Sequence, residues 1–268
     1  MQPIPVLALT WSPASRYLAS GSADALVRIF DLQKREHALT LRGQRSGVCA
    51  LSWSPSEVHV ASASALGDVL VHRVQGSVSA VCRAPAAAGC AVRGVHWSPF
   101  HPSKLAAASD DGVVSLWDMT PSRDPAAPTK LPIGTLLHKF CSHTAACCGV
   151  AWSKVNHHLL VSAAADGQVL FYDSTRHAVV RTIVADSSPI TSLTFAPDGL
   201  HIACGTSEGQ VRHLPRTHAP SWQRRNLTGC MPLRWRTPIC SAMFVLVCQQ
   251  HSMYPCPVDS SIRSALPL

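Results

Sequence analysis

A short motif, in which an aromatic residue is followed by Ser-Pro or a close variant of it, constrains the fold more than any other feature. Apolar residues alternate before it, as in Leu7-Ala8-Leu9-Thr10-Trp11-Ser12-Pro13. Its aromatic anchors are 42, 44, 55 and 43 residues apart, at Trp11, Trp53, Trp97, Trp152 and Phe195. A period of about 40–45 residues suits a unit of four short strands. We therefore expect five copies of one such unit.

Each copy continues with the same succession of strands and turns. Second strands of small residues are expected at Tyr17–Ser22, His59–Ser64, Leu105–Ser109, Leu159–Ala163 and His201–Thr206. Their small side chains suggest a crowded position near a central channel. A tight Asp- or Gly-containing turn, a third strand and a polar outer strand follow, the last at His37–Leu41 and Val179–Val184. This alternation with frequent turns predicts antiparallel sheets.

These landmarks resemble those of WD repeats, which implies an all-β WD-repeat β-propeller of about five four-stranded blades. One propeller domain is expected over residues 1–215, and its repeats are expected near 5–43, 48–84, 92–140, 147–185 and 190–215. The long third interval contains a Pro- and Ala-rich insertion, residues 121–132, that is typical of a surface loop.

The periodicity ends in the fifth repeat. Leu214-Pro215 stands where other repeats carry an aromatic residue and Asp, and residues 216–268 are expected to form an irregular tail that contains Cys, Pro and Arg. Five blades of a larger ring leave two open edges, so an incomplete or open ring is expected.

The net charge of +8 lies mainly outside the repeats. Residues 1–215 hold 17 Lys and Arg against 14 Asp and Glu, whereas the tail holds 6 Arg and a single acid, Asp259. This distribution argues against a nucleic-acid-binding face on the repeats. The 11 Cys show no CxxC spacing, and neither a signal peptide nor a membrane-length apolar run is apparent. A cytoplasmic protein with free thiols and no membrane partner is expected.

WD repeats often contain a buried hydrogen-bond network in which a His bonds the turn Asp, the Asp bonds a Ser or Thr, and that residue bonds an aromatic residue. Only the fourth repeat keeps most of this set, as His143, Ser162, Asp166 and Tyr172. A His, an Asp and a Ser could also form a nucleophilic triad. Because the positions fall on repeat landmarks and no Gly-x-Ser-x-Gly motif is present, we predict a structural network and no enzyme.

The other repeats depart from this set. The first repeat has Gln44 in the loop where the next His belongs, and the second has Leu66 in place of the turn Asp and His72 in place of the aromatic residue. Such blades are expected to be held mostly by apolar packing.

Two groups of residues could be taken for metal ligands. His157-His158 has no second pair at ligand spacing. The tail group has spacings of ten, eight and eight, which do not match a zinc knuckle; it comprises His251 with Cys230, Cys240, Cys248 and Cys256. We predict no metal, no cofactor and no small-molecule substrate.

Some longer segments are more specific than the general repeat. They include Ser109-Asp-Asp-Gly-Val-Val-Ser-Leu-Trp-Asp and Leu170-Phe-Tyr-Asp-Ser, which continues through Phe195-Ala-Pro-Asp-Gly. Their order and spacing resemble the developmentally down-regulated neural-precursor WD protein family over about residues 16–212. That family targets the γ-tubulin ring complex to centrosomes and spindles. Its members carry further blades and a C-terminal segment that binds γ-tubulin complex components, and neither is recognisable in this sequence.

The resemblance implies a non-catalytic, microtubule-organising adaptor at the cytoskeleton. Its partners would be the γ-tubulin ring complex or scaffold proteins of the centrosome and spindle. The alternative is a generic WD-repeat adaptor in a ubiquitin ligase or RNA-associated complex, and a third hypothesis is an enzyme that uses the central channel. Partner contacts are expected on the loops at one end of the blades, where Arg45, Asp110 and His143 are candidates.

Overall fold

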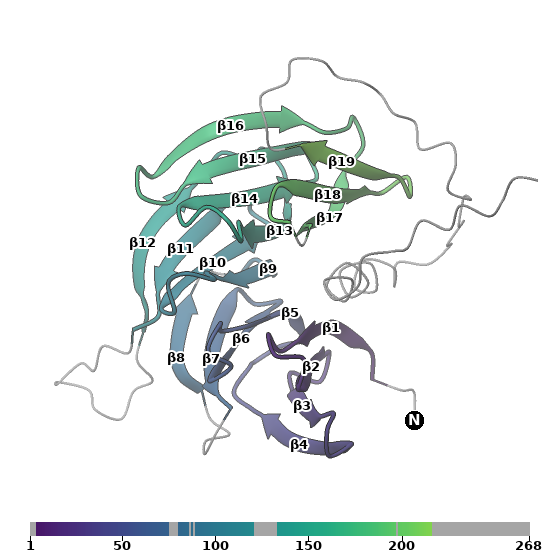
Figure 1. Cartoon of the computed structure of the whole chain (residues 1–268), viewed down its shortest axis with the longest axis vertical. Coiled ribbons are helices and arrows are strands. Elements are labelled where there is room, and N and C mark those ends of the chain that lie inside the picture. The colour runs from purple at the N-terminus through teal and green to yellow at the C-terminus, as the bar shows by residue number, and fades with distance from the viewer. Residues whose placement is uncertain are drawn as a thin grey trace, which may run out of the picture.

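The computed structural model describes residues 4–74, 80–85, 87, 89–120, 133–196 and 198–215. All regular structure within these residues is β, in five antiparallel sheets arranged as the blades of a propeller (Figure 1). The prediction of an all-β propeller is confirmed. No helix among the described residues is long and apolar enough to cross a membrane. The expected loop at 121–132 and the tail at 216–268 lie outside the described residues.

Each of the first two blades has four strands. Blade 1 consists of β1 (Val6–Trp11), β2 (Tyr17–Ser22), β3 (Val27–Asp31) and β4 (Glu36–Leu41). Blade 2 consists of β5 (Val48–Trp53), β6 (His59–Ser64), β7 (Asp68–Arg73) and β8 (Ala80–Pro85).

Blades 3 and 4 repeat this plan, and blade 5 has three strands within the described residues. Blade 3 consists of β9 (Val92–Trp97), β10 (Lys104–Ser109), β11 (Val114–Asp118) and β12 (Thr135–Phe140). Blade 4 consists of β13 (Cys147–Trp152), β14 (Leu159–Ala164), β15 (Gln168–Asp173) and β16 (Ala178–Val184). Blade 5 consists of β17 (Ile190–Phe195), β18 (His201–Thr206) and β19 (Val211–Pro215).

The first strand of every blade lies innermost. Strands pair in sequence order, and neighbouring blades meet through β1 and β5, β5 and β9, β9 and β13, and β13 and β17. The suggestion that the small-residue second strands line the channel was wrong. Small residues serve instead where blades pack face to face, so that Ala61, Ala106 and Ser162 are fully buried.

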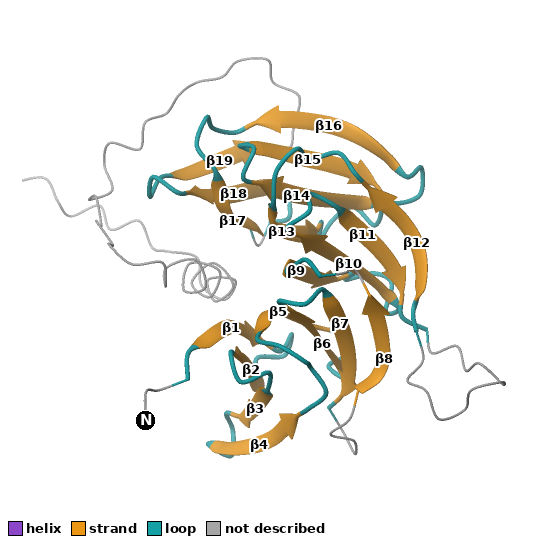
Figure 2. Cartoon of the chain, turned by 180° about the vertical axis from the view of Figure 1, so that it is seen from behind, coloured by secondary structure: helices purple, strands orange, loops and turns teal. Residues whose placement is uncertain are grey.

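The five blades form an open arc. Each blade contacts the next through its first strand, but the described residues show no comparable contact between β17 and β1. Both views show a gap between the strands of blade 1 and those of blade 5 (Figure 2). The predicted open ring is confirmed.

The aromatic anchors hold neighbouring blades together. Trp53 packs in one core cluster with Ile29 of blade 1, and Trp152 packs in another with Leu116 of blade 3. Trp53 Nε1 also donates a 3.4 Å hydrogen bond to the carbonyl oxygen of Thr10 in the preceding blade. Burying each large apolar side chain contributes roughly 1.5–3 kcal/mol. The Trp of the repeat motif therefore serves mainly to pack neighbouring blades against each other.

Candidate functional site: the inner rim of the arc

A β-bulge recurs at one position of every innermost strand. In each first strand one residue is skipped in the pairing with the second strand, and it lies four residues before the aromatic anchor. These residues are Leu7, Cys49, Arg93, Cys148 and Thr191, which we call the inner rim. A bulge frees a residue from the regular pairing and redirects its side chain. The arc therefore presents one freed side chain per blade along its innermost strands.

A backbone hydrogen bond fixes the loops beside the rim in all five blades. The first residue after each second strand donates its N–H to a carbonyl oxygen just before the first strand of the same blade. The pairs are Ala23–Pro5, Ala65–Gly47, Asp110–Ala91, Ala165–Ala146 and Ser207–Pro189. Because these bonds tie the turn after the second strand to the start of the first, Asp110 is held beside Arg93.

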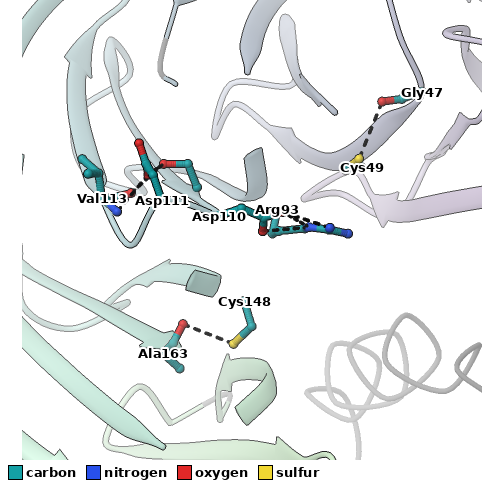
Figure 3. Close-up of polar contacts among 9 residues, drawn as sticks. Gly47, Cys49, Arg93, Asp110, Asp111, Val113, Cys148 and Ala163 are labelled. Carbon is teal, nitrogen blue, oxygen red and sulfur yellow. Dashed lines mark hydrogen bonds and ion pairs between the residues drawn. The ribbon is translucent and has the colours of Figure 1, made fainter. Parts of the chain in front are cut away.

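The rim carries one strong ion pair. Arg93 Nε lies 2.9 Å and 3.1 Å from the two carboxylate oxygens of Asp110, and its Nη2 lies 3.0 Å from Oδ2 (Figure 3). The hydrogen bond to Asp110 raises the pKa of Arg93. The Arg93 side chain is still 54% exposed. Such a fork fixes the guanidinium, which keeps further N–H groups for a partner.

The two rim cysteines carry neutral thiols. Cys49 and Cys148 donate to the carbonyl oxygens of Gly47 and Ala163 at 3.6 Å and 3.2 Å (Figure 3). Burial raises the pKa of both thiols, that of Cys148 to about 12. Only a thiolate is a good nucleophile or metal ligand, so these side chains act as small apolar surface.

The rim combines contact surfaces of different kinds. Leu7 is 43% exposed, Thr191 is exposed, and the thiols lie half-buried between blades. The described residues contain no group of three His, Cys, Asp or Glu side chains that could hold a metal ion. The arrangement suits apolar contact, hydrogen bonding and one cationic anchor rather than bond-breaking chemistry.

Arg45 supplies a second cation at the same end of the blades. Its guanidinium pairs with Asp68, which also lies 3.9 Å from Arg83. Arg45 is 64% exposed, so it remains open to a partner. Two guanidinium groups share one carboxylate here, and blade 2 therefore carries an excess of positive charge at this end.

The fourth blade contains a continuous polar chain. His143 Nδ1 lies 3.0 Å from Asp166, His143 Nε2 lies 2.6 Å from Ser162 Oγ, and Ser162 Oγ lies 3.0 Å from the Tyr172 hydroxyl. The His therefore stands between the Asp and the Ser, whereas the order expected from the repeat family had the Asp between them. The structure brings all four residues of the proposed network together.

Charge decides the direction of these hydrogen bonds. Burial lowers the pKa of His143 despite Asp166, so the ring is neutral. Burial opposes ionisation of Asp166, but hydrogen bonds from Gln168, His143 and Thr144 together lower its pKa below the ordinary value. The neutral ring donates a hydrogen bond from Nδ1 to the Asp166 carboxylate and accepts one at Nε2 from the Ser162 hydroxyl.

This geometry removes His143 from the list of partner contacts. Its side chain is fully buried, and both ring nitrogens are used inside the blade. Ser162 is also fully buried, so a substrate has no access to it. The role that suits these residues best is stabilisation of blade 4.

The second blade contains a related network that the sequence patterns did not reveal. Gln44 Nε2 donates to the carbonyl oxygen and the hydroxyl of Ser62, both at 2.8 Å, and Ser62 Oγ lies 3.5 Å from His72 Nε2. Blade 2 therefore contains a polar network in addition to the apolar packing that was expected to hold most of it. A usable signal was the spacing, because Gln44 precedes Ser62 by 18 residues and His143 precedes Ser162 by 19.

The repeats match one family model. The matching description is "WD domain, G-beta repeat", over residues 3–31, 35–73, 75–118, 134–173 and 178–213. The chain belongs to the WD-repeat family. Each later repeat begins near the outer strand of one blade and ends near the third strand of the next, as residues 35–73 run from β4 to β7. A WD repeat in this chain therefore spans two neighbouring blades.

Among curated proteins this WD-repeat chain is similar to "Protein NEDD1" from three mammals. The identity is 36% with the Bos taurus protein, 35% with that of Mus musculus and 31% with that of Homo sapiens, each over 222 residues. The match covers 78% of this chain and 31% of each relative. It confirms the family resemblance inferred from the sequence, and the chain spans about a third of the length of these relatives.

A solved structure supports the fold. A chain of "Crystal Structure of Mitotic Checkpoint Complex" superimposes with a TM-score of 0.68 and 24% sequence identity, covering 79% of this chain and 63% of that chain. At this identity the likeness shows the WD-repeat propeller fold alone.

Proposed function

We propose that this chain is a non-catalytic interaction scaffold that helps to localise the γ-tubulin ring complex to the centrosome and spindle. The observation that carries the proposal is the similarity to "Protein NEDD1" over 78% of the chain. WD-repeat propellers are typically protein-binding scaffolds, and the chain resembles the family that targets this complex. We place the protein in the cytoplasm, at microtubule-organising centres.

The inner rim is the proposed contact surface. Arg93, held by Asp110, offers a fixed and half-exposed guanidinium, and Arg45 offers a second at the same end of the blades. Arginine is enriched among the residues that dominate protein interfaces, and steering by charge speeds association. Leu7 adds exposed apolar surface to the same rim. A protein segment with acidic and apolar residues would complement it.

A second candidate is a WD-repeat adaptor without a link to microtubules, for example in a ubiquitin ligase or an RNA-associated complex. The chain is 28% identical over 72% of its length to the Arabidopsis thaliana protein "Cell division cycle 20.6, cofactor of APC complex". That similarity is weaker than the similarity to "Protein NEDD1".

The test uses the full chain carrying a tag in dividing cells. We expect enrichment at spindle poles and, through the centrosome and spindle scaffold proteins that the chain would bind there, co-precipitation of γ-tubulin. Arg93→Glu places a second carboxylate beside Asp110, and we expect it to reduce both signals about tenfold or more, in the range of a dominant interface residue.

The matched control is Arg176→Glu. Arg176 also forms an ion pair with an Asp of its own blade, at 3.8 Å from Asp173, but it is 83% exposed on an outer turn. Equal effects of the two substitutions would remove the rim from the proposal. Absence of both pole enrichment and γ-tubulin from the unsubstituted chain would reject the microtubule role and leave the second candidate.

A further inference from the structure

A valine recurs at one position of every third strand, and only one of the five is uncovered. These residues are Val27, Val69, Val114, Val169 and Val211. The first four are at most 1% exposed, whereas Val211 of blade 5 is 50% exposed. The same side chain at the same place in the blade therefore lies in two different environments.

The outer strand accounts for the difference. In blades 1 to 4 the valine is paired across β-strands with a buried residue of the fourth strand, namely Leu41, Ala84, Phe140 and Ile183 in turn. Each of these four residues belongs to the hydrophobic cluster that its blade shares with the following blade. Within the described residues, β19 has no fourth strand beside it (Figure 2). Its outer backbone groups are those of an edge strand.

We propose that the β19 edge accepts an extended segment of a partner protein as the fourth strand of blade 5. Addition of a strand to an open edge is a common mode of peptide recognition, in which backbone bonds give affinity and alternate side chains give specificity. The segment runs antiparallel to β19 and places a large aliphatic or aromatic residue opposite Val211. That residue takes the place that Leu41 and Ile183 occupy in blades 1 and 4.

Blade 1 indicates what stands opposite Arg212. The equivalent residue is Arg28, which pairs with Thr40 of the outer strand and forms an ion pair with Asp24 at 2.6 Å. Arg212 is likewise held by Asp186, at 2.8 Å. Since the guanidinium already has a carboxylate, the partner needs an uncharged polar residue there rather than an acid.

Register explains why the occupant is a partner rather than the adjacent stretch of this chain. In blades 1 to 4 the residue opposite the valine follows it by 14, 15, 26 and 14 positions. The residues at those distances after Val211 are Arg225, Asn226 and Thr237, and none of them is the apolar residue that the other blades bury. Burying an unpaired polar or charged side chain at that place is unfavourable.

The test measures binding of a fluorescein-labelled peptide to the full chain by anisotropy. The peptide has the sequence Ala-Val-Val-Arg-Thr-Ile-Val of residues 178–184, which offers Ile opposite Val211 and Thr opposite Arg212. We expect saturable binding that Val211→Lys weakens about tenfold or more, because it puts a charge where apolar contact is needed. The matched variant Val180→Lys alters a 64% exposed valine of the complete blade 4 and should leave the Kd unchanged.

Two further measurements can overturn the proposal. A peptide N-methylated at the alternate backbone nitrogens that would face β19 cannot pair with that edge, and equal binding of this peptide would exclude strand addition. Slow hydrogen exchange at Val211 and His213, whose N–H groups face away from β18, would mean that the edge is already occupied in the peptide-free chain. Equal peptide affinity of the Val211→Lys and Val180→Lys variants would also reject the site.

Discussion

Blades 4 and 2 hold a buried serine at the same place with different chemistry. Ser162 and Ser62 are both fully buried in second strands. In blade 4 the serine bonds to His143, which is in turn held by Asp166. In blade 2 it bonds to the amide of Gln44, and among the described residues no carboxylate contacts that amide. The comparison shows that the Asp is needed by the His and not by the serine. The amide of Gln44 donates its hydrogen bond to Ser62 without a carboxylate beside it.

The two solutions differ in how completely they satisfy buried atoms. In blade 4 both ring nitrogens of His143 have partners. In blade 2, Gln44 Oε1 and His72 Nδ1 are buried without a hydrogen-bond partner among the described residues. An unsatisfied buried polar atom costs roughly 1–3 kcal/mol. Blade 4 should therefore depend strongly on its network, and blade 2 should lose less when its own is altered.

The largest effect is expected from His143→Ala. It removes one hydrogen bond from the buried Ser162 hydroxyl and the hydrogen bond that His143 donates to the Asp166 carboxylate, and each such loss costs roughly 1–3 kcal/mol. Urea denaturation should show this loss, and amide exchange should accelerate first in β14 and β15. The control is His158→Ala, an exposed His in a turn of the same blade, which should change stability by less than about 0.5 kcal/mol. A similar small loss for both variants would contradict the importance of the network.

The next prediction concerns the dependence of stability on pH, which should differ between blades 2 and 4. Burial lowers the pKa of His72 from 6.5 to about 4, so the folded chain favours the neutral ring. The free energy of unfolding is therefore unaffected by the titration of His72 above pH 6.5. It falls as the pH drops from 6.5 towards 4, because in that interval the unfolded chain binds a proton at His72 and the folded chain does not. The loss is about 3 kcal/mol over that interval. In blade 4 the same position is Tyr172, which stays neutral throughout this range.

His72→Tyr should therefore flatten the dependence of stability on pH. The measurement is the urea midpoint at pH 7 and at pH 4.5 for the original and substituted chains. His143 also has a lowered pKa, so part of the pH dependence should persist in the variant. An unchanged difference between the two pH values would show that His72 does not titrate on unfolding as its burial requires.

Strand positions could be predicted from the sequence because they depend on local alternation. The expected strands Tyr17–Ser22, His59–Ser64 and His201–Thr206 coincide with β2, β6 and β18. Their distance from the propeller axis could not be predicted in this way, since alternation fixes which face a residue takes and not which strand lies innermost.

The candidate site was harder to predict. Asp110 was expected from its loop, but its partner Arg93 lies on a strand, where a β-bulge frees it from pairing. A bulge has no signature within a single repeat. The network around Gln44 could not be predicted from the repeat pattern, because the pattern has a His at this place and here an amide fills it.

The smallest effect tests the comparison most directly, by building the blade 4 network in blade 2. Gln44→His alone should lose about 1 kcal/mol, because one ring nitrogen then lacks a partner. Leu66→Asp alone should have little effect, since Leu66 is 46% exposed and the new carboxylate is partly hydrated. In the double variant the new His can donate to the new Asp, as His143 donates to Asp166. The double-mutant cycle should therefore give a favourable coupling of about 1 kcal/mol.

The control cycle combines Gln44→His with Lys34→Asp, an acid placed on the surface of blade 1. Lys34 has a 64% exposed side chain, and distant sites usually add without coupling. Zero coupling in both cycles would mean that the backbone of blade 2 does not bring positions 44 and 66 together as blade 4 brings 143 and 166. A favourable coupling confined to Gln44→His with Leu66→Asp would show that the two blades share one scaffold and differ only in the side chains that satisfy it.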